Sequence, residues 1–267
     1  MKHNVSPIAI VTAACLLVCL VIACAFLPWV ARQYGPGESS EYTKDDIPGD
    51  VASYPLPDVG SVTYSELSVY FRDVALSVEG SGYTDTVKKW VIPMRYSIEG
   101  TMTDRDREVF AEVTSAMNSV PGFPGIYEAA PGEEPNLKLY FCDDEWFENS
   151  FFRSKNVFAI FIHDADLFGG KSDITSASIA FRCSMSQEYR NAVIWEELLQ
   201  ASGLMNDSFL HEDSLFYQEH WKHQDNGVQK PTELDWLLFQ FLYHPAIRPG
   251  MTFRQCQPML WGAFLLQ

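Results

Sequence analysis

The sequence predicts an α+β fold in which helices pack on a mixed or mostly antiparallel sheet. Short apolar segments bounded by turn residues recur between residues 91 and 181 and have the length of strands. Longer segments with apolar residues at helical spacing begin near Thr103, Asn191 and Thr232. At 267 residues, 47% hydrophobic and 14% aromatic, the chain can bury a sizeable core. The order strand, helix, several strands, long helix, loop and second helix therefore favours an α+β domain.

Turn and capping residues place the individual elements. Strands are expected over residues 91–98, 125–130, 136–141, 157–162 and 176–181. Helices are expected from Thr103 to Pro121, over 143–147, from Ser184 or Ser186 to Gly203, and from Thr232 to Pro245. Thr232 and Asp235 have the spacing of a capping box. Residues 65–76 fit both a short helix and an edge strand.

The first 32 residues predict a membrane segment. Residues 7–31 carry no charge and are long enough to cross a ~30 Å hydrocarbon layer as a helix. Lys2 precedes this segment and Arg32 and several acidic residues follow it, which favours an extracytoplasmic location for the rest of the chain. The segment is either an uncleaved signal anchor or a lipoprotein signal, with Cys24 of the lipobox-like VIAC acylated. The apolar run continues past Cys24, which favours the anchor.

Three parts follow from this organisation. Residues 1–32 are expected to form the anchor or lipoprotein signal, 33–60 a linker rich in Pro, Gly and acidic residues, and 61–267 an extracytoplasmic domain at the cell membrane. Lys2 and Arg32 are the only charged side chains before residue 33, so the remainder holds 17 basic and 35 acidic residues, a net charge of −18. Binding to phosphates needs a basic surface, so nucleic acid is not an expected partner.

Three cysteines lie outside the N-terminal segment: Cys142, Cys183 and Cys256. None belongs to a C-x-x-C pair, which argues against a structural zinc site. In an oxidising compartment Cys142 and Cys183 could form a disulfide between neighbouring strands. Three free thiols are an equally good interpretation.

The segment 191–206, NAVIWEELLQASGLMN, carries polar residues where an apolar core face is expected. Its spacing is that of H-E-x-x-H-x-x-G-x-x-H, in which the histidines bind zinc and the glutamate acts as general base. The three histidine positions are replaced, by Glu196, Gln200 and Asn206. The glutamate and the glycine are kept, as Glu197 and Gly203. The motif thus has the scaffold of a zinc peptidase without its metal ligands.

The available donors disfavour a metal. A catalytic zinc needs three His, Cys or carboxylate ligands, whereas Gln200 and Asn206 offer only amide oxygens. An all-oxygen set that includes Asp207 would suit calcium better, but the Asp-rich loop of a dedicated calcium site is missing. No metal or other cofactor is therefore expected.

Two enzymatic alternatives remain open. Further zinc ligands could come from the residues that follow the helix: His211, Glu219, His220 and His223. Glu197 would then be the general base of an active hydrolase. A glycosidase would need two carboxyl groups facing each other, and since adjacent glutamates diverge on a helix, Asp164 or Asp166 would have to supply the second. The favoured interpretation is a polar network in the place of the lost metal, with Asp207 bracing the loop.

The order of elements and the sequence EELLQASGL resemble the catalytic domain of zincin metallopeptidases, particularly the metzincins. In metzincins a turn containing methionine lies beneath the metal, and Gly250-Met251 stands at the corresponding place. The chain is also similar, over about residues 90–255, to a family of bacterial proteins catalogued as domain of unknown function 2927. That similarity rests on four segments: 196–207, Ser214-Leu215-Phe216, 234–238, and Leu242-Tyr243 to Met251. It implies a zincin-like fold and no known activity.

The expected function is that of a membrane-tethered, catalytically degenerate metallopeptidase-like domain that binds a peptide or a cell-envelope partner. The alternative is an active metal-dependent hydrolase with Glu197 as base and non-standard ligands. No catalytic residue is expected under the first interpretation. The positions of the degenerate site are Glu196, Glu197, Gln200, Gly203, Asn206, Asp207 and Met251.

Overall fold

The computed structural model describes residues 54–78, 82–83, 86–150, 159–163, 172–219 and 228–265. The expected membrane segment, with Cys24, and the linker up to residue 53 lie outside these ranges. So do Asp164, Asp166, His220 and His223. Within the described ranges, no helix combines the length and the apolar character needed to cross a membrane.

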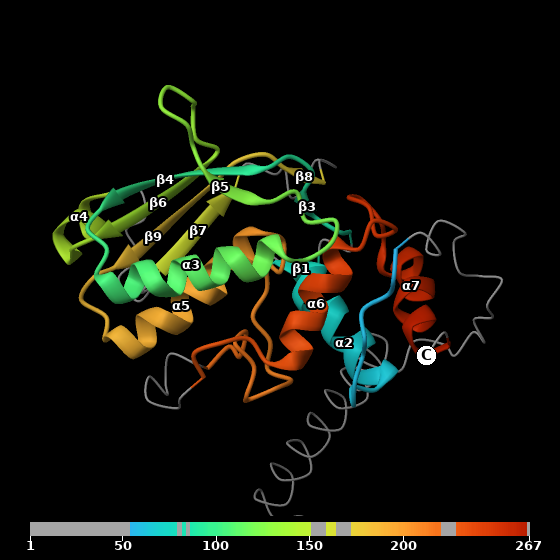
Figure 1. Cartoon of the computed structure of the whole chain (residues 1–267). Helices are drawn as coiled ribbons and strands as arrows, with labels where there is room; N and C mark the ends of the chain where they lie inside the picture. The colour runs from blue at the N-terminus through green and yellow to red at the C-terminus, as the bar shows by residue number, and fades with distance from the viewer. Residues whose placement is uncertain are drawn as a thin grey trace, which may run out of the picture. The chain divides into compact units, whose positions relative to one another are not determined.

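A five-stranded sheet forms the larger layer of the fold (Figure 1). Its strands are β4 (Met94–Gly100), β5 (Ile126–Glu128), β6 (Leu137–Cys142), β7 (Ala159–His163) and β9 (Ala177–Arg182), in the spatial order β5-β4-β6-β9-β7. β5, β4, β6 and β9 are parallel, and only β7 runs antiparallel, beside β9. The sheet is therefore mixed, which confirms one of the two expected arrangements, and it is mostly parallel rather than mostly antiparallel.

Two short pairs of strands lie outside this sheet. β1 (Ser77–Val78) pairs antiparallel with β2 (Gly82–Tyr83). β3 (Lys89–Trp90) pairs parallel with β8 (Asp173–Ile174). The strand expected over 91–98 begins only at Met94, because Pro93 has no amide proton for a ladder hydrogen bond.

Six helices occur among the described residues: α2 (Tyr64–Ala75), α3 (Asp104–Asn118), α4 (Asp144–Asn149), α5 (Gln187–Ala201), α6 (Glu233–Tyr243) and α7 (Phe253–Leu265). Figure 1 shows α3 and α5 side by side on one face of the sheet, while α2, α6 and α7 gather at the other end of the domain. Residues 65–76 are thus helical, since Thr63 and Glu66 form a capping box at the start of α2. Helix α7 was not predicted from the sequence.

The core lies between the sheet and the α3–α5 layer and continues among α2, α6 and α7. Phe141 and Phe181, paired in register on β6 and β9, stack with ring centroids 4.7 Å apart. Met117 of α3 and Leu198 of α5 belong to the same fully buried cluster. Burying a side chain of this size stabilises the fold by roughly 1.5–3 kcal/mol. This packing holds α5 against the sheet. Helix α5 follows β9 in the sequence and carries the degenerate motif.

Candidate functional site

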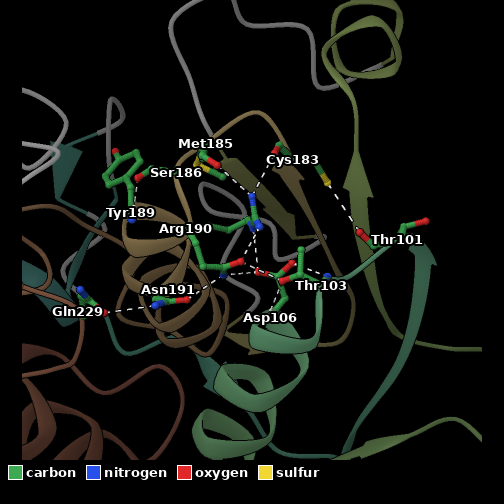
Figure 2. Close-up of polar contacts among 11 residues, drawn as sticks. Thr101, Thr103, Asp106, Cys183, Met185, Ser186, Tyr189, Arg190, Asn191 and Gln229 are labelled. Atoms are coloured by element: carbon green, nitrogen blue, oxygen red, sulfur yellow. Dashed lines mark hydrogen bonds and ion pairs between the residues drawn. The ribbon is translucent and has the colours of Figure 1, made fainter.

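A buried ion pair fixes the start of α5 (Figure 2). Arg190 Nε lies 2.8 Å from Asp106 Oδ1 of α3, and the two side chains are 6% and 0% exposed. Gln187 Nε2 donates to the same oxygen at 2.8 Å. Burial by itself would raise the pKa of Asp106, but the hydrogen bonds from Arg190 and Gln187 outweigh it and lower the pKa. The predicted cap at Ser186, one of two candidates, is confirmed by its bond from the Tyr189 amide.

A Schellman motif ends α5. The Gly203 amide donates to Gln200 O at 2.9 Å, and the Leu204 amide donates to Leu199 O at 3.2 Å. Gly203 has φ +121°, and a Cβ there would lie 2.2 Å from Lys88 O. Glycine is therefore required here both for the backbone conformation and for the close approach of residue 88.

Two buried aromatic side chains hold the last carbonyl groups of this helix. Trp90 Nε1 donates to Ala201 O at 2.8 Å. The Tyr243 hydroxyl donates to Ser202 O at 2.7 Å. Carbonyl groups at a helix end lack intrahelical partners, so these bonds set the position of the C-terminal end of α5 relative to β3 and α6.

The Gly250-Met251 turn pairs with the segment that also contacts Gly203. The Gly250 amide donates to Val87 O at 2.9 Å, and the Val87 amide donates to Met251 O at 2.8 Å. Residues 87–88 thus connect the turn with the end of α5. The sulfur of Met251 accepts a hydrogen bond from the Arg248 amide at 3.0 Å, so the side chain closes its own turn.

The polar face of α5 contacts the loop that follows it. Gln200 is 5% exposed, and its Nε2 donates to Asp207 Oδ1 at 2.6 Å. Gln218 Nε2 donates to the other oxygen of Asp207 at 3.4 Å. Asn206 Nδ2 donates to the backbone oxygen of Asp207 at 2.5 Å. The structure therefore brings Gln200, Asn206 and Asp207 together, with Gln200 on the Asp207 carboxylate and Asn206 on its backbone oxygen.

The loop that carries Asp207 is itself anchored. The Ser208 amide donates to Phe216 O at 2.7 Å, and the Gln218 amide donates to Ser208 O at 2.9 Å. Ser208 Oγ donates to Asp73 Oδ2 of α2 at 2.6 Å. The carboxylate of Asp207 is thus held in place from α5, from its own loop and indirectly from α2.

Tyr189 is a site residue that the sequence reasoning missed. It lies two helical turns before Glu196, on the same face of α5, and is half-buried. Its pKa is raised strongly, first by burial and then by the negative charges of Glu196, Glu197 and Asp207. The phenol therefore stays protonated next to three carboxylates. Its spacing of seven residues from Glu196 is the sequence feature that places it on the same helix face as Glu196.

The two motif glutamates differ in exposure. Glu197 is 8% exposed, whereas Glu196 is half-buried. Glu196, the more exposed of the two, can attract a cationic group by charge.

In the described part of the chain, no group of three or more His, Cys, Asp or Glu side chains has the arrangement of a metal site. The ring of His211 packs edge-on against Tyr70 of α2, with centroids 4.7 Å apart. Glu219 is half-buried.

Two of the segments that carry the family resemblance, 214–216 and 234–238, meet in the interior. Ser214 Oγ donates to Asp235 Oδ1 at 2.7 Å, and the Tyr70 hydroxyl donates to the same oxygen at 3.0 Å. Ser214, Asp235 and Tyr70 are at most 1% exposed, so this cluster stabilises the fold and is closed to a substrate.

Comparison with known proteins agrees with the resemblance drawn from these segments. The sequence profile described as Protein of unknown function (DUF2927) matches residues 64–261, a wider range than the motifs indicated. No curated protein and no solved structure matches the chain. The match covers most of the protein and includes α2 to α6 and most of α7. The chain therefore belongs to the DUF2927 family of proteins of unknown function.

Proposed function

We propose that the protein is a membrane-tethered, extracytoplasmic domain of zincin type that has lost its metal and binds a peptide without cleaving it. The observation that carries the proposal is the 2.6 Å hydrogen bond from Gln200 Nε2 to Asp207 Oδ1. Gln200 holds the position of the second zinc-binding histidine, and its amide is engaged by a carboxylate. A side chain bonded in this way replaces the metal as the link between helix and loop.

The sheet topology supports the zincin part of the proposal. A strand and a helix are followed by further strands, and α5 comes directly after β9. β7 runs antiparallel to β9 and forms one edge of the described sheet. Helix α5 contacts this edge strand. This is the order of elements on which the resemblance to zincin catalytic domains rests.

The proposed ligand is an extended peptide with basic side chains. An edge strand offers backbone donors and acceptors, so a peptide can add to β7 as a further strand. The negative charges of Glu196, Glu197 and Asp207 all raise the pKa of Tyr189, so the surroundings of this side chain are acidic. A lysine or arginine of the bound peptide would meet this acidic region.

Membrane tethering rests on the sequence alone. The uncharged segment 7–31 supports it, and the acidic residues after Arg32 support an extracytoplasmic location. The domain would thus meet peptides or basic components of the cell envelope.

Peptide binding and cleavage can be measured together. The full chain is titrated with an extended octapeptide rich in lysine, and the mixture is then analysed by mass spectrometry for cleavage. We expect saturable binding, no cleavage, and weaker binding by Glu196→Gln. Glu188→Gln is the matched control, since Glu188 is an exposed carboxylate in the first turn of the same helix. Cleavage that is abolished by Glu197→Gln would refute the proposal and support the hydrolase alternative.

A further inference from the structure

A second candidate site lies at the carboxyl ends of the parallel strands. A cavity of about 460 Å³ opens where β4 and β6 end. Trp146 of α4 and Cys183, the first residue after β9, also line it. This volume falls within the range of small-molecule sites. The cavity is lined by none of the residues of α5 and is independent of the function proposed above.

The connections of the sheet place this cavity at a topological switch point. From β4 the chain passes through α3 to β5, on one side of β4. From β6 it passes through α4 to β7 and β9, on the opposite side. In open sheets with parallel strands, the loops separate at such a point and leave a crevice beyond the strand ends, where ligands bind.

The end of β4 is shaped by a glycine. Gly100 has φ +88°, and a Cβ there would lie 1.8 Å from Phe141 O of β6. No other residue permits this approach of the two strand ends. The close contact forms one wall of the cavity, since Gly100 and Phe141 both line it.

The lining is aromatic and acidic. Trp146 of α4 stacks on Tyr140 of β6, with ring centroids 5.1 Å apart and an interplanar angle of 27°, and it remains 38% exposed. Glu99 and Asp143, both exposed, add two carboxylates. None of the residues that line the cavity is basic.

The neighbouring cations are engaged elsewhere. Arg182 Nη1 lies 3.2 Å from Asp144 Oδ1, and Arg182 Nη2 lies 2.6 Å from Glu148 Oε1. The Cζ atom of the same guanidinium lies 4.0 Å from the ring centroid of Phe147. Lys138 Nζ lies 3.6 Å from Glu134 Oε1. The cavity thus keeps a negative potential of its own.

The cysteines of the cavity are free thiols, Cys142 and Cys183. The sequence allowed either a disulfide between Cys142 and Cys183 or three free thiols. In the structure all three cysteines, including the buried Cys256, are free thiols. Burial, followed by the neighbouring thiol, raises the pKa of Cys142 to about 12, and burial also raises the pKa of Cys183. They are neutral at physiological pH and add weakly polar surface without the thiolates that a soft metal needs.

We infer that this cavity binds a small organic ammonium ion. An aromatic face attracts a cation through its quadrupole, and alkylated ammonium ions are recognised by aromatic side chains combined with carboxylates. Trp146 and Tyr140 supply the aromatic surface, and Glu99 and Asp143 supply the charge. Apolar substituents on the nitrogen would contact the two thiols.

Calorimetric titration of the full chain with choline tests this inference. The chain is kept in a polyoxyethylene detergent, which carries neither a cation nor a sugar. We expect saturable binding below ~10 mM choline, and none of the neutral isostere 3,3-dimethyl-1-butanol. Equal binding of the two compounds, or no saturable binding of choline, would overturn the inference. Saturable binding of N-acetylglucosamine without choline binding would assign the cavity to carbohydrate instead.

Variants locate the binding in the cavity. Trp146→Leu should weaken choline binding ~10-fold by removing the exposed ring, and Glu99→Gln should weaken it ~3-fold or more. Asp143→Asn removes a charge but keeps the cap of α4, because asparagine is as good an N-cap as aspartate. Glu128→Gln, an exposed carboxylate on β5, is the control and should bind choline like the unmodified chain. Unchanged binding by the three cavity variants would exclude this cavity as the site.

Discussion

Ser214 Oγ donates a hydrogen bond to Asp235 Oδ1 at 2.7 Å, and this contact joins two segments 21 residues apart. Asp235 also accepts the Leu215 amide at 3.0 Å and the Thr232 amide at 2.9 Å. One fully buried carboxylate therefore caps α6, anchors the loop before it and binds Tyr70 of α2. Residues that look like functional signatures in the sequence are here part of the framework.

Replacing Asp235 with alanine should destabilise the fold by ~3 kcal/mol or more, because several buried donors lose their acceptor at once. Urea unfolding, followed by tryptophan fluorescence, measures the change in the free energy of unfolding. Asp213→Ala is the control, since Asp213 is exposed and close by in the sequence. Similar losses in the two variants would contradict the framework role of Asp235.

The Asp106–Arg190 pair predicts a stability that depends on pH. The pKa of Asp106 is lower in the folded state than in the unfolded chain, where it is about 3.9. The stabilisation is therefore present above this unfolded value and is lost as the pH falls through the folded pKa. Unfolding measured between pH 7 and pH 2 should show a shallower acid dependence in Asp106→Asn than in the unmodified chain.

Removing either partner of this pair alone should cost ~3–5 kcal/mol, since it leaves a buried charge. The double variant Asp106→Leu with Arg190→Met should recover much of the loss. Additive effects of the two substitutions in a double-mutant cycle would show that the two charges are not coupled.

Gly203→Ala should destabilise the protein by ~3 kcal/mol, from the left-handed backbone conformation and the overlap with Lys88 O together. Gly132→Ala is a matched control, because Gly132 has φ +86° but nothing within 4 Å of an added Cβ. It should cost only ~1 kcal/mol, from the backbone alone. Thermal unfolding of both variants separates the two contributions, and equal losses would argue against a close contact at residue 88.

Restoring three histidines tests the zincin proposal directly. The triple variant Glu196→His, Gln200→His and Asn206→His should bind zinc at about one ion per chain, since three imidazoles complete a catalytic-type site. Metal content by mass spectrometry, on chain produced without a histidine tag, measures this. The unmodified chain should hold much less than one zinc, and Gln200→His alone should not change that. A folded triple variant without zinc would show that the loop after α5 does not bring residue 206 to the helix face.

Much of the secondary structure could be predicted because its signals are local. Apolar segments placed β5, β6, β7 and β9, and caps placed α3, α5 and α6 within a few residues. Residues 65–76 fit a helix and a strand by apolar pattern alone, and the capping box of Thr63 and Glu66 favours the helix α2. Helix α7 contains Pro258, which weakens the local signal for a helix, although the Thr252 amide donates to Gln255 Oε1 at its start.

The sequence by itself determined most of the elements, because caps and apolar periodicity are local signals. It also determined the acidic charge and the degenerate motif, because spacing along one helix fixes which side chains share a face. The parallel direction of β4, β6 and β9 was decided only in the tertiary structure. So were the bond between Gln200 and Asp207 and the cavity between the ends of β4 and β6. These features join segments through space, and their energies depend on burial and on partners that no local pattern encodes.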